Sequence, residues 1–486
     1  MWLKLSFILL TAAGLICASG CDGSISTASS SPAIHNEWTW KGGSTAVNQK
    51  GIYGTMGVAD SGSTPGARTS PSSWTDAYGN LWLFGGYGYD SVGTKGDLND
   101  LWKYSGGEWT WMSGSSTIEA QGVYGTIGTP ASGNVPGSRY EATSWADASG
   151  NFWLFGGLGL DSTGTRGDLN DLWKYSNGEW MWVDGSNVAA KQGVAGAYQG
   201  SGVYGTLGIA APSNKPGVRV DATSWADSSG NLWLFGGEGS GLNESFGILN
   251  DLWKYSNGEW TWMSGSDTAG SGQQGIYGTQ GIPASDNVPG SRTDAVGWAD
   301  ADGNLWLFGG QGNDSTGGVT CSTNGGPCLL NDLWKYSNGE WTWMGGSSLS
   351  NEPGTYGTQG IAAPGNIPGA RWMAVNWIDG AGDVWLFGGQ GFDSTTGTST
   401  VYGVLNDFWK FSGGQWTWMG GSNLASTTQS GIYGTQGVPS VSNIPGQRES
   451  AVSWIDQAGN LWLFGGDDEF SVSPGGSYND LWEYQP

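Results

Sequence analysis

The sequence predicts an all-β protein, a six-bladed β-propeller of four-stranded blades. Three observations predict this fold: a motif that recurs six times, four strand-like segments in each repeat, and a set of tryptophans that is complete only when the two ends of the chain are combined. Sheets repeated in this way stack face to face around an axis, which buries both faces of each sheet.

The repeated motif is Asn-Leu-Trp-Leu-Phe-Gly-Gly, which begins at Asn80 and has close copies at residues 151, 231, 304, 383 and 460. Its apolar run is of strand-forming type and stops at a glycine pair, which indicates a buried strand that ends at a sharp turn. Successive copies lie 71 to 80 residues apart and span most of the chain. One large body is therefore expected, although 486 residues would allow several domains.

Each repeat contains four short strands, which the second repeat shows most clearly at residues 139–145, 151–155, 170–175 and 179–183. Asn177-Gly178 separates the last two strands, and this pair favours a two-residue hairpin turn. Asp147 opens the turn after the first strand, where its short side chain can accept hydrogen bonds from the following amides. The third and fourth strands are therefore expected to be antiparallel neighbours.

Five tryptophan positions recur in every repeat except the last, which has only Trp454, Trp462 and Trp482. The missing pair occurs at the other end of the chain, in Glu37-Trp38-Thr39-Trp40. We therefore predict that the N-terminal strand completes the last blade and closes the ring, so that the propeller spans residues 37–486.

The repeat resembles the kelch repeat over residues 37–486. The shared features are an arginine that opens the first strand, an aromatic second strand that ends in Gly-Gly, an Asn-Asp-Leu-Trp third strand and a tryptophan in the fourth. Kelch repeats are shorter, at about 50 residues. The excess here lies mainly in copies of Gly-Ile-Tyr-Gly-Thr, which start at residues 51, 122, 202, 275, 354 and 431. We expect these loops to be ordered and to cover one face of the ring.

The first 20 residues are typical of a signal peptide, with Lys4 before a long apolar run. Small residues directly before Cys21 resemble the lipobox of bacterial lipoproteins, which implies lipidation of Cys21; plain secretion is the alternative. The serine-rich segment 21–36 is expected to be a flexible tether. These features predict an extracytoplasmic protein, either secreted or lipid-anchored in the cell envelope, that contacts membrane only through its anchor.

Two cysteines remain in the propeller, Cys321 and Cys328, and a loop containing Gly-Gly-Pro separates them. In an exported protein they are expected to form a disulfide. A metal site is the weaker alternative, because no histidine lies nearby. The formal charge of −24 repels phosphate backbones, so nucleic acid is not an expected partner. We expect a monomer.

Six of the seven arginines occupy one repeat position at the start of the innermost strand. The predicted ring places their guanidinium groups around one mouth of the axial channel, where they would bind an anionic ligand through paired hydrogen bonds. The alternative is structural, with each arginine paired to a repeated aspartate such as Asp171 or Asp251. The six are Arg68, Arg139, Arg219, Arg292, Arg371 and Arg448.

The residues that follow each arginine differ between repeats, and a site for one ligand needs such unrepeated groups. Trp372 is the one tryptophan after the signal peptide that lies outside the repeated set, and its ring could stack on a sugar or grip a peptide. Glu141, Asp221 and Asp294 are its predicted polar partners. Packing between blades is the alternative role for these residues.

The favoured function is a ligand-binding module that takes a glycan or protein at the cell surface through the loop face around its channel. No cofactor or metal is expected: galactose oxidase, which has kelch blades, needs two copper-binding histidines, and this chain has only His35. The resemblance also implies an alternative, a carbohydrate-active enzyme of the sialate mutarotase (N-acetylneuraminate epimerase) type, in which channel carboxylates would act as acid and base. A surface structural protein that makes repetitive contacts is a third possibility.

Overall fold

The structure is a computed structural model. It describes residues 36–147, 149–190, 200–242, 245–270, 273–317, 328–395, 402–425, 429–468 and 475–486. Within these ranges the chain forms strands and turns, with no α-helix. Nothing in the described part is a helix with the length and apolar character to cross a bilayer. The predicted signal peptide, Cys21, Cys321 and all of the tether but Asn36 lie outside the described residues. Cys328 is disulfide-bonded.

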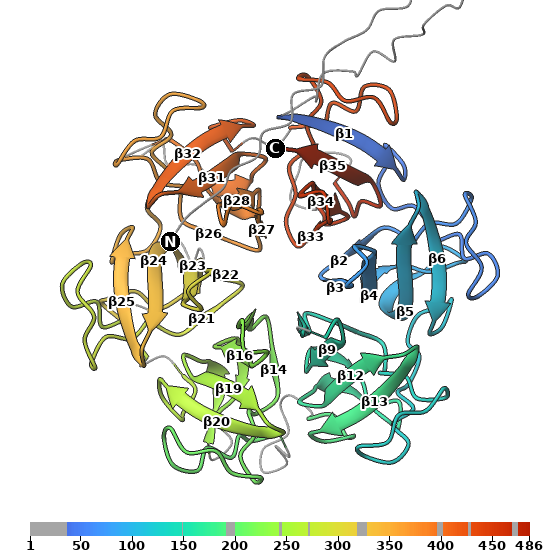
Figure 1. Cartoon of the computed structure of the whole chain (residues 1–486), viewed down its shortest axis with the longest axis horizontal. Coiled ribbons are helices and arrows are strands. Elements are labelled where there is room, and N and C mark those ends of the chain that lie inside the picture. Colours follow the sequence, from blue (N-terminus) through green and yellow to red (C-terminus); the bar gives the residue numbers. More distant parts are fainter. Residues whose placement is uncertain are drawn as a thin grey trace, which may run out of the picture. The chain divides into compact units, whose positions relative to one another are not determined.

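One compact unit runs from Asn36 to Pro486. It consists of six antiparallel blades arranged around a central axis (Figure 1), as predicted. From the innermost strand outward, the blades are β3 (Ser72–Thr75), β4 (Leu81–Tyr89), β5 (Lys95–Ser105) and β6 (Glu108–Ser113); β8 (Thr143–Ala146), β9 (Phe152–Phe155), β12 (Leu172–Ser176) and β13 (Glu179–Asp184); β15 (Thr223–Ala226), β16 (Leu232–Phe235), β19 (Leu252–Ser256) and β20 (Glu259–Ser264); β22 (Val296–Ala299), β23 (Leu305–Gly312), β24 (Leu329–Ser337) and β25 (Glu340–Gly345); β27 (Val375–Ile378), β28 (Val384–Phe387), β31 (Phe408–Ser412) and β32 (Gln415–Gly420); and β33 (Val452–Ile455), β34 (Leu461–Phe464), β35 (Leu481–Gln485) and β1 (Glu37–Gly42).

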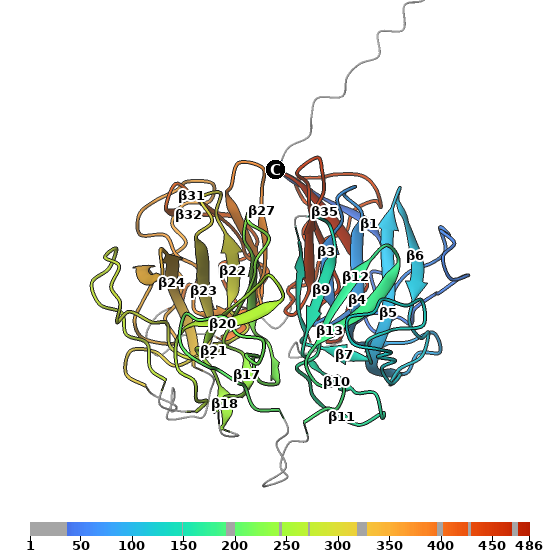
Figure 2. The ribbon, with the colours of Figure 1, turned by 60° about the horizontal axis from the view of Figure 1, so that its bottom comes forward.

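Shorter strands extend the first five blades at one end, which we call the small-sheet end. Figure 2 shows β7, β10, β11, β17 and β18 together at this end. Three-stranded sheets form there in the second, third and fifth blades, whereas β2 and β21 pair directly with the long strands β4 and β23. These shorter strands are β2 (Arg68–Thr69), β7 (Arg139–Tyr140), β10 (Leu158–Leu160), β11 (Arg166–Asp168), β14 (Arg219–Val220), β17 (Glu238–Ser240), β18 (Phe246–Ile248), β21 (Arg292–Thr293), β26 (Arg371–Trp372), β29 (Gln390–Phe392) and β30 (Tyr402–Val404).

The N-terminal strand completes the sixth blade, which confirms the prediction from the tryptophans. Strand β1 pairs antiparallel with β35, with Trp38 opposite Tyr484 and Trp40 opposite Trp482. Figure 1 shows the two strands, dark blue and dark red, side by side. The innermost strands contact one another in cyclic order, including β3 with β33, so the ring is closed.

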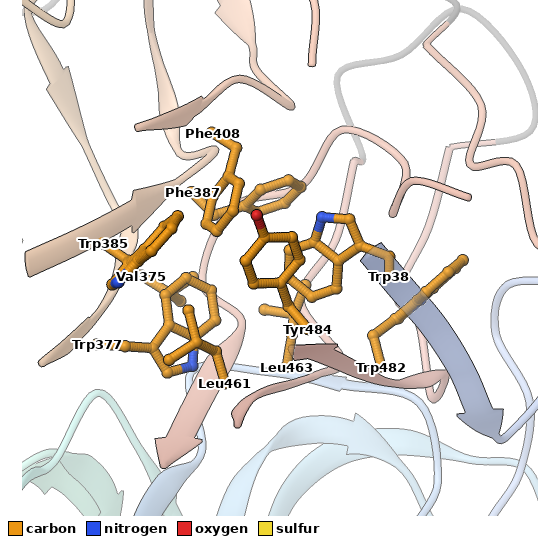
Figure 3. Packing of buried hydrophobic residues seen from close by; sticks show 10 residues of the cluster. All are labelled: Trp38, Val375, Trp377, Trp385, Phe387, Phe408, Leu461, Leu463, Trp482 and Tyr484. Atoms are coloured by element: carbon orange, nitrogen blue, oxygen red, sulfur yellow. The ribbon is translucent and has the colours of Figure 1, made fainter. Parts of the chain in front are cut away.

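The core consists of six apolar clusters, and each lies between two neighbouring blades. Figure 3 shows the cluster between the fifth and sixth blades, where Trp38 and Tyr484 face Trp385 and Phe408. Each buried aromatic side chain removes about 150–250 Å² from water. Repeated tryptophans therefore fill every interface between blades, and this fixes the geometry of the central channel.

The Gly-Ile-Tyr-Gly-Thr loops are ordered, but their position corrects the expectation that they cover one face of the ring. In the first blade the amide of Gly57 donates to the carbonyl of Trp111 on the outermost strand, at 2.7 Å, and the equivalent bond recurs in all six blades. The loop therefore runs along the outer edge of its blade. The physical reason is that an edge strand leaves backbone groups unpaired, and this loop supplies partners for them.

Candidate functional site

The six repeated arginines are buried, with side chains that expose none of their surface. Each makes a two-pronged ion pair with the aspartate of its own blade's Asn-Asp-Leu-Trp segment, which reads Asn-Asp-Phe-Trp in the fifth blade. The pairs are Arg68–Asp100, Arg139–Asp171, Arg219–Asp251, Arg292–Asp332, Arg371–Asp407 and Arg448–Asp480.

In the second blade, Nη1 and Nη2 of Arg139 lie 2.7 and 2.8 Å from the two carboxylate oxygens of Asp171. Tyr124 and Trp173 donate to the same carboxylate at 2.6 and 2.7 Å. Burial opposes the charge on Arg139, but Asp171 holds the pKa of the guanidinium above its ordinary value. Burial and Asp171 together raise the pKa of the Tyr124 hydroxyl well above its usual range.

This arrangement corrects the prediction that the arginines form a ligand-binding ring at the channel mouth. A buried guanidinium whose hydrogen bonds go to a carboxylate and to carbonyls has nothing left to offer an anion. The structure shows the alternative instead, pairing with repeated aspartates. These residues hold the strands of each blade together and are excluded from the candidate site.

The second residue after each arginine lines the channel. All six have positive φ angles between 49° and 56°, although none is glycine. The amide of each donates to the carbonyl of its counterpart in the preceding blade, at 2.9 to 3.3 Å, so that six hydrogen bonds form a closed circle. The six residues are Ser70, Glu141, Asp221, Asp294, Met373 and Ser450. Such backbone angles are costly for these residue types, and the circle of hydrogen bonds stabilises them.

A cavity of about 200 Å³ lies inside this circle, lined by the same six residues and by Pro71 and the alanines that follow them. Its wall is asymmetric. Glu141, Asp221 and Asp294 come from the second, third and fourth blades and lie next to one another along the circle. The other half presents Met373 and two serines. Three of the predicted site residues are therefore brought together at the axis.

The channel carboxyls resist ionisation. Burial raises the pKa of Glu141 to about 8, with Asp294 and Glu238 adding to the effect. Burial raises the pKa of Asp294 to about 7. The pKa of Asp221 is raised well above its usual range, first by burial and then by the neighbouring carboxyls of Asp294 and Glu141. The interaction between the two aspartates raises the pKa of Asp221 and lowers that of Asp294. Within the described ranges, no group of three or more His, Cys, Asp or Glu side chains is suited to hold a metal ion.

The first residue after each arginine pairs across the strands with a residue that follows the Gly-Gly turn. We call these twelve positions the mouth residues: Thr69 with Tyr87, Tyr140 with Leu158, Val220 with Glu238, Thr293 with Gln311, Trp372 with Gln390, and Glu449 with Asp467. The first residue of each pair adjoins a channel-lining residue in sequence, and Glu238 acts electrostatically on all three channel carboxyls. Unlike the arginines, most of the mouth residues differ from blade to blade.

Two groups of aromatic side chains each contain mouth residues together with neighbouring side chains. In the first, the rings of Tyr87 and Tyr140 lie 5.5 Å apart, and the guanidinium of Arg166 lies 5.7 Å from the Tyr140 ring centre. Nε of Arg166 lies 2.7 Å from Oδ2 of Asp97 in the neighbouring blade. Arg166 keeps 47% of its side-chain surface exposed, so this guanidinium, unlike the buried six, is accessible to a ligand.

The second group surrounds Trp372 in the fifth blade. Its indole N–H donates to Oε1 of Gln390 at 3.0 Å, and the hydroxyl of Tyr402 donates to the same oxygen. The rings of Tyr402 and Phe392 lie 5.6 Å apart. Trp372 is partly buried and so keeps some exposed surface.

Sequence reasoning missed Arg166, Gln390, Tyr402 and Tyr87. One signal was available: Arg166 is the single arginine outside the repeated position, and departure from the repeat is the property that identified Trp372. Gln390 and Tyr402 carry no such signal, because their importance depends on the register between β26, β29 and β30.

Larger hollows lie between blades at the rim. One has a volume of about 600 Å³ and is lined by Asn331, Gly345, Gly346 and Trp416, among others. Another, of about 550 Å³, is lined by the counterparts Asn479, Gly42, Gly43 and Trp109. Both are built from repeated positions, so they are features of the scaffold rather than a site for one ligand.

The fold defines the chain as a six-bladed β-propeller whose unrepeated side chains gather around one end of its channel. No model of a known protein family matches the sequence, and no curated protein matches it. Among solved structures, it is similar to YjhT, at 14% identity and a TM-score of 0.47, over 86% of this chain and 95% of that one. It is also similar to a fungal alcohol oxidase of the AA5 family in complex with copper, at 12% identity and a TM-score of 0.44, over 90% of this chain and 76% of that one. A third similar structure is a protein of unknown function from Dyadobacter fermentans, at 9% identity and a TM-score of 0.41, over 89% and 97% of the two chains.

Proposed function

We propose that this protein is a carbohydrate-binding propeller that takes its ligand at the channel mouth on the small-sheet end. One observation carries the proposal: the six repeated arginines are paired with aspartates within their own blades, whereas the unrepeated aromatic and polar groups gather at and beside the mouth residues. A ligand that binds once needs such a set.

The aromatic groups suit a sugar. A pyranose has an apolar face that packs on indole or phenol rings, and hydroxyls that bond to neighbouring polar groups. Trp372 and Tyr402 provide one such surface, and Tyr87, Tyr140 and Arg166 provide another. The channel carboxyls, whose pKa values are raised by burial, line the channel beside these groups and disfavour charge beneath a neutral ligand.

A glycan array probed with the full chain and with Trp372→Ala tests this function. The wild type is expected to bind a defined set of glycans, and Trp372→Ala is expected to lose at least tenfold in affinity. Tyr78→Ala is the matched control, because Tyr78 is 83% exposed in a turn at the opposite end of the strands. Undiminished binding by Trp372→Ala refutes the proposed site. Binding of no glycan, with capture of a peptide segment instead, favours a protein ligand.

A carbohydrate-active enzyme of the mutarotase type is the second candidate function. The raised pKa values of the channel carboxyls favour it. Two of them have pKa values of about 7 and 8, which lie near the operating pH that acid–base catalysis requires. NMR of sugar anomers, with sialic acid first, tests this candidate. If the wild type accelerates the exchange of anomers and Asp221→Asn does not, the enzyme function is supported. If neither protein changes the rate of exchange, the enzyme function is refuted.

We further propose that the protein is exported, with Cys21 lipidated, and acts at the cell surface as a monomer. The apolar segment before Cys21 supports export, and the small residues beside it support lipidation. Labelling with a radioactive fatty acid tests lipidation, since Cys21→Ser should lose the label.

We also infer that the repeats are diverged kelch repeats, because arginine, Gly-Gly and Asn-Asp-Leu-Trp recur in kelch order.

A further inference from the structure

Gln390 is a buried amide held in one orientation beside an exposed aromatic surface. It lies on the middle strand of the small sheet in the fifth blade, opposite Trp372 on one side and Val404 on the other. Only 2% of the surface of Gln390 is exposed. A polar group buried to this degree normally has all its hydrogen bonds made.

The orientation of the amide follows from its partners. An indole N–H can only donate, so the Gln390 atom that faces Trp372 must be the oxygen. The Tyr402 hydroxyl donates to that same oxygen. The NH2 group therefore faces away from both rings, and none of the residues that the structure describes accepts a hydrogen bond from it.

We propose that Gln390 is a specificity-determining residue that selects neutral acetamido sugars, and that its NH2 group donates to the acetamido carbonyl. This inference rests on the proposed carbohydrate function and names the sugar class for it. Trp372 would pack against the apolar face of the ring. A ligand without an acceptor would cover this donor and leave it unpaired, and such discrimination is typically strong.

The surrounding charge favours a neutral ligand over an anionic one. Glu449 in the next blade is close enough to Tyr402 to contribute to its raised pKa, after burial as the main cause. A uronate or sialate carboxylate would meet this side chain on a protein of formal charge −24. An acetamido carbonyl presents an acceptor without charge.

Two trisaccharides with the same backbone test the proposal by isothermal titration calorimetry at pH 6. Triacetylchitotriose carries the acetamido group and cellotriose does not. The full-length wild type is expected to bind triacetylchitotriose at least tenfold more tightly than cellotriose. Gln390→Glu keeps the acceptor oxygens for Trp372 and Tyr402 but loses the amide donor, so we expect this ratio to fall close to one.

Gln390→Met serves as a second variant, in case the new carboxyl disturbs the fold, and it should also bring the ratio close to one. Gln359→Glu is the matched control, since Gln359 is an exposed glutamine on the outer-edge loop of the fifth blade, where its amide donates to the carbonyl of Met419 and not to a mouth residue. It should keep the wild-type ratio. Melting temperatures report whether each variant is folded.

The outcomes separate this inference from the function on which it rests. A tenfold preference that survives in both Gln390 variants overturns the role of Gln390. Binding of other glycans on the array, with no preference for the acetamido trisaccharide, overturns the selectivity but keeps the carbohydrate function. Binding of no glycan at all overturns both.

Discussion

Trp38 and Tyr484 lie opposite each other on β1 and β35, with ring centres 5.1 Å apart, although 446 positions of sequence separate them. Trp38 is 5% exposed and also packs on aromatic rings of the fifth blade, at 5.9 Å from Phe387 and 5.4 Å from Phe408. One side chain near the N-terminus therefore holds together two blades at the other end of the chain.

Trp38→Ala is accordingly expected to lower the free energy of unfolding by about 3–5 kcal/mol, as is typical when a buried tryptophan is truncated. Urea denaturation measures the change. Val441→Ala provides the control, since Val441 is 85% exposed and its truncation should cost less than about 0.5 kcal/mol. An equal midpoint for Trp38→Ala and the wild type would contradict the closure described above.

The buried ion pairs lead to a second prediction. Arg139→Ala leaves the Asp171 carboxylate buried without its cation and should cost about 3–5 kcal/mol of stability. Arg166→Ala removes a half-exposed guanidinium, which water can partly replace beside the buried Asp97, and should therefore cost less than Arg139→Ala. Denaturant titration compares the two variants. Equal costs would mean that burial is not what makes the repeated arginines important.

Stability should fall as the pH rises from about 4 to about 8, on account of the channel carboxyls. Their pKa values are raised in the folded state by burial, whereas in the unfolded chain a glutamate loses its proton near pH 4.3. Their contribution to stability is therefore fully present when the pH is below the pKa of the unfolded state. It is lost as the pH rises through the pKa of the folded state.

Glu141→Gln should therefore reduce the loss of stability between pH 5 and pH 9 by at least about 1 kcal/mol, the equivalent of roughly one pKa unit. Chemical denaturation at the two pH values measures it. Asp60→Asn, which changes an exposed side chain, should follow the wild type. A pH dependence that is identical in Glu141→Gln and the wild type would contradict the raised pKa.

A fourth prediction concerns the glycine pair that ends the second strand. Gly156 has a φ of +66°, and a β-carbon there would lie 2.8 Å from the carbonyl oxygen of Arg219 in the next blade. Gly178 has a φ of +86° but has open space around it. Both alanine variants incur backbone strain, and only Gly156→Ala adds a clash between blades.

Gly156→Ala should therefore cost about 1–3 kcal/mol more than Gly178→Ala. Thermal unfolding of the two variants, followed by circular dichroism, provides the comparison. Equal melting temperatures would show that the glycine is needed for its φ angle alone.

Repetition made the fold predictable, since each of the six copies carries the same strand and turn signals. The position of Trp38 followed from the tryptophan count alone. The role of the arginines did not follow from the sequence, because an arginine that opens an inner strand can point into the channel or into its own blade. The outcome is decided by a carboxylate 32 to 40 residues away, such as Asp171 or Asp332.

The candidate site was predictable only in part. Glu141, Asp221 and Asp294 were selected because they break the repeat, and they do meet at the axis. Nothing in the sequence indicated that their amides form a circle, because positive φ angles at acidic residues carry no compositional signal. Gln390 was missed for a similar reason: the register between strands, rather than residue type, brings it to Trp372.

The circle of amides at the axis has an electrostatic consequence. Each N–H···O=C link carries a dipole that points to the preceding blade, and six such vectors arranged head to tail around a closed circle largely cancel one another. Peptide groups aligned along a helix instead add up and create a charged pole that attracts ions. The tangential parts of these dipoles therefore cancel at the axis, so the preference of the channel for charge depends mainly on its side chains.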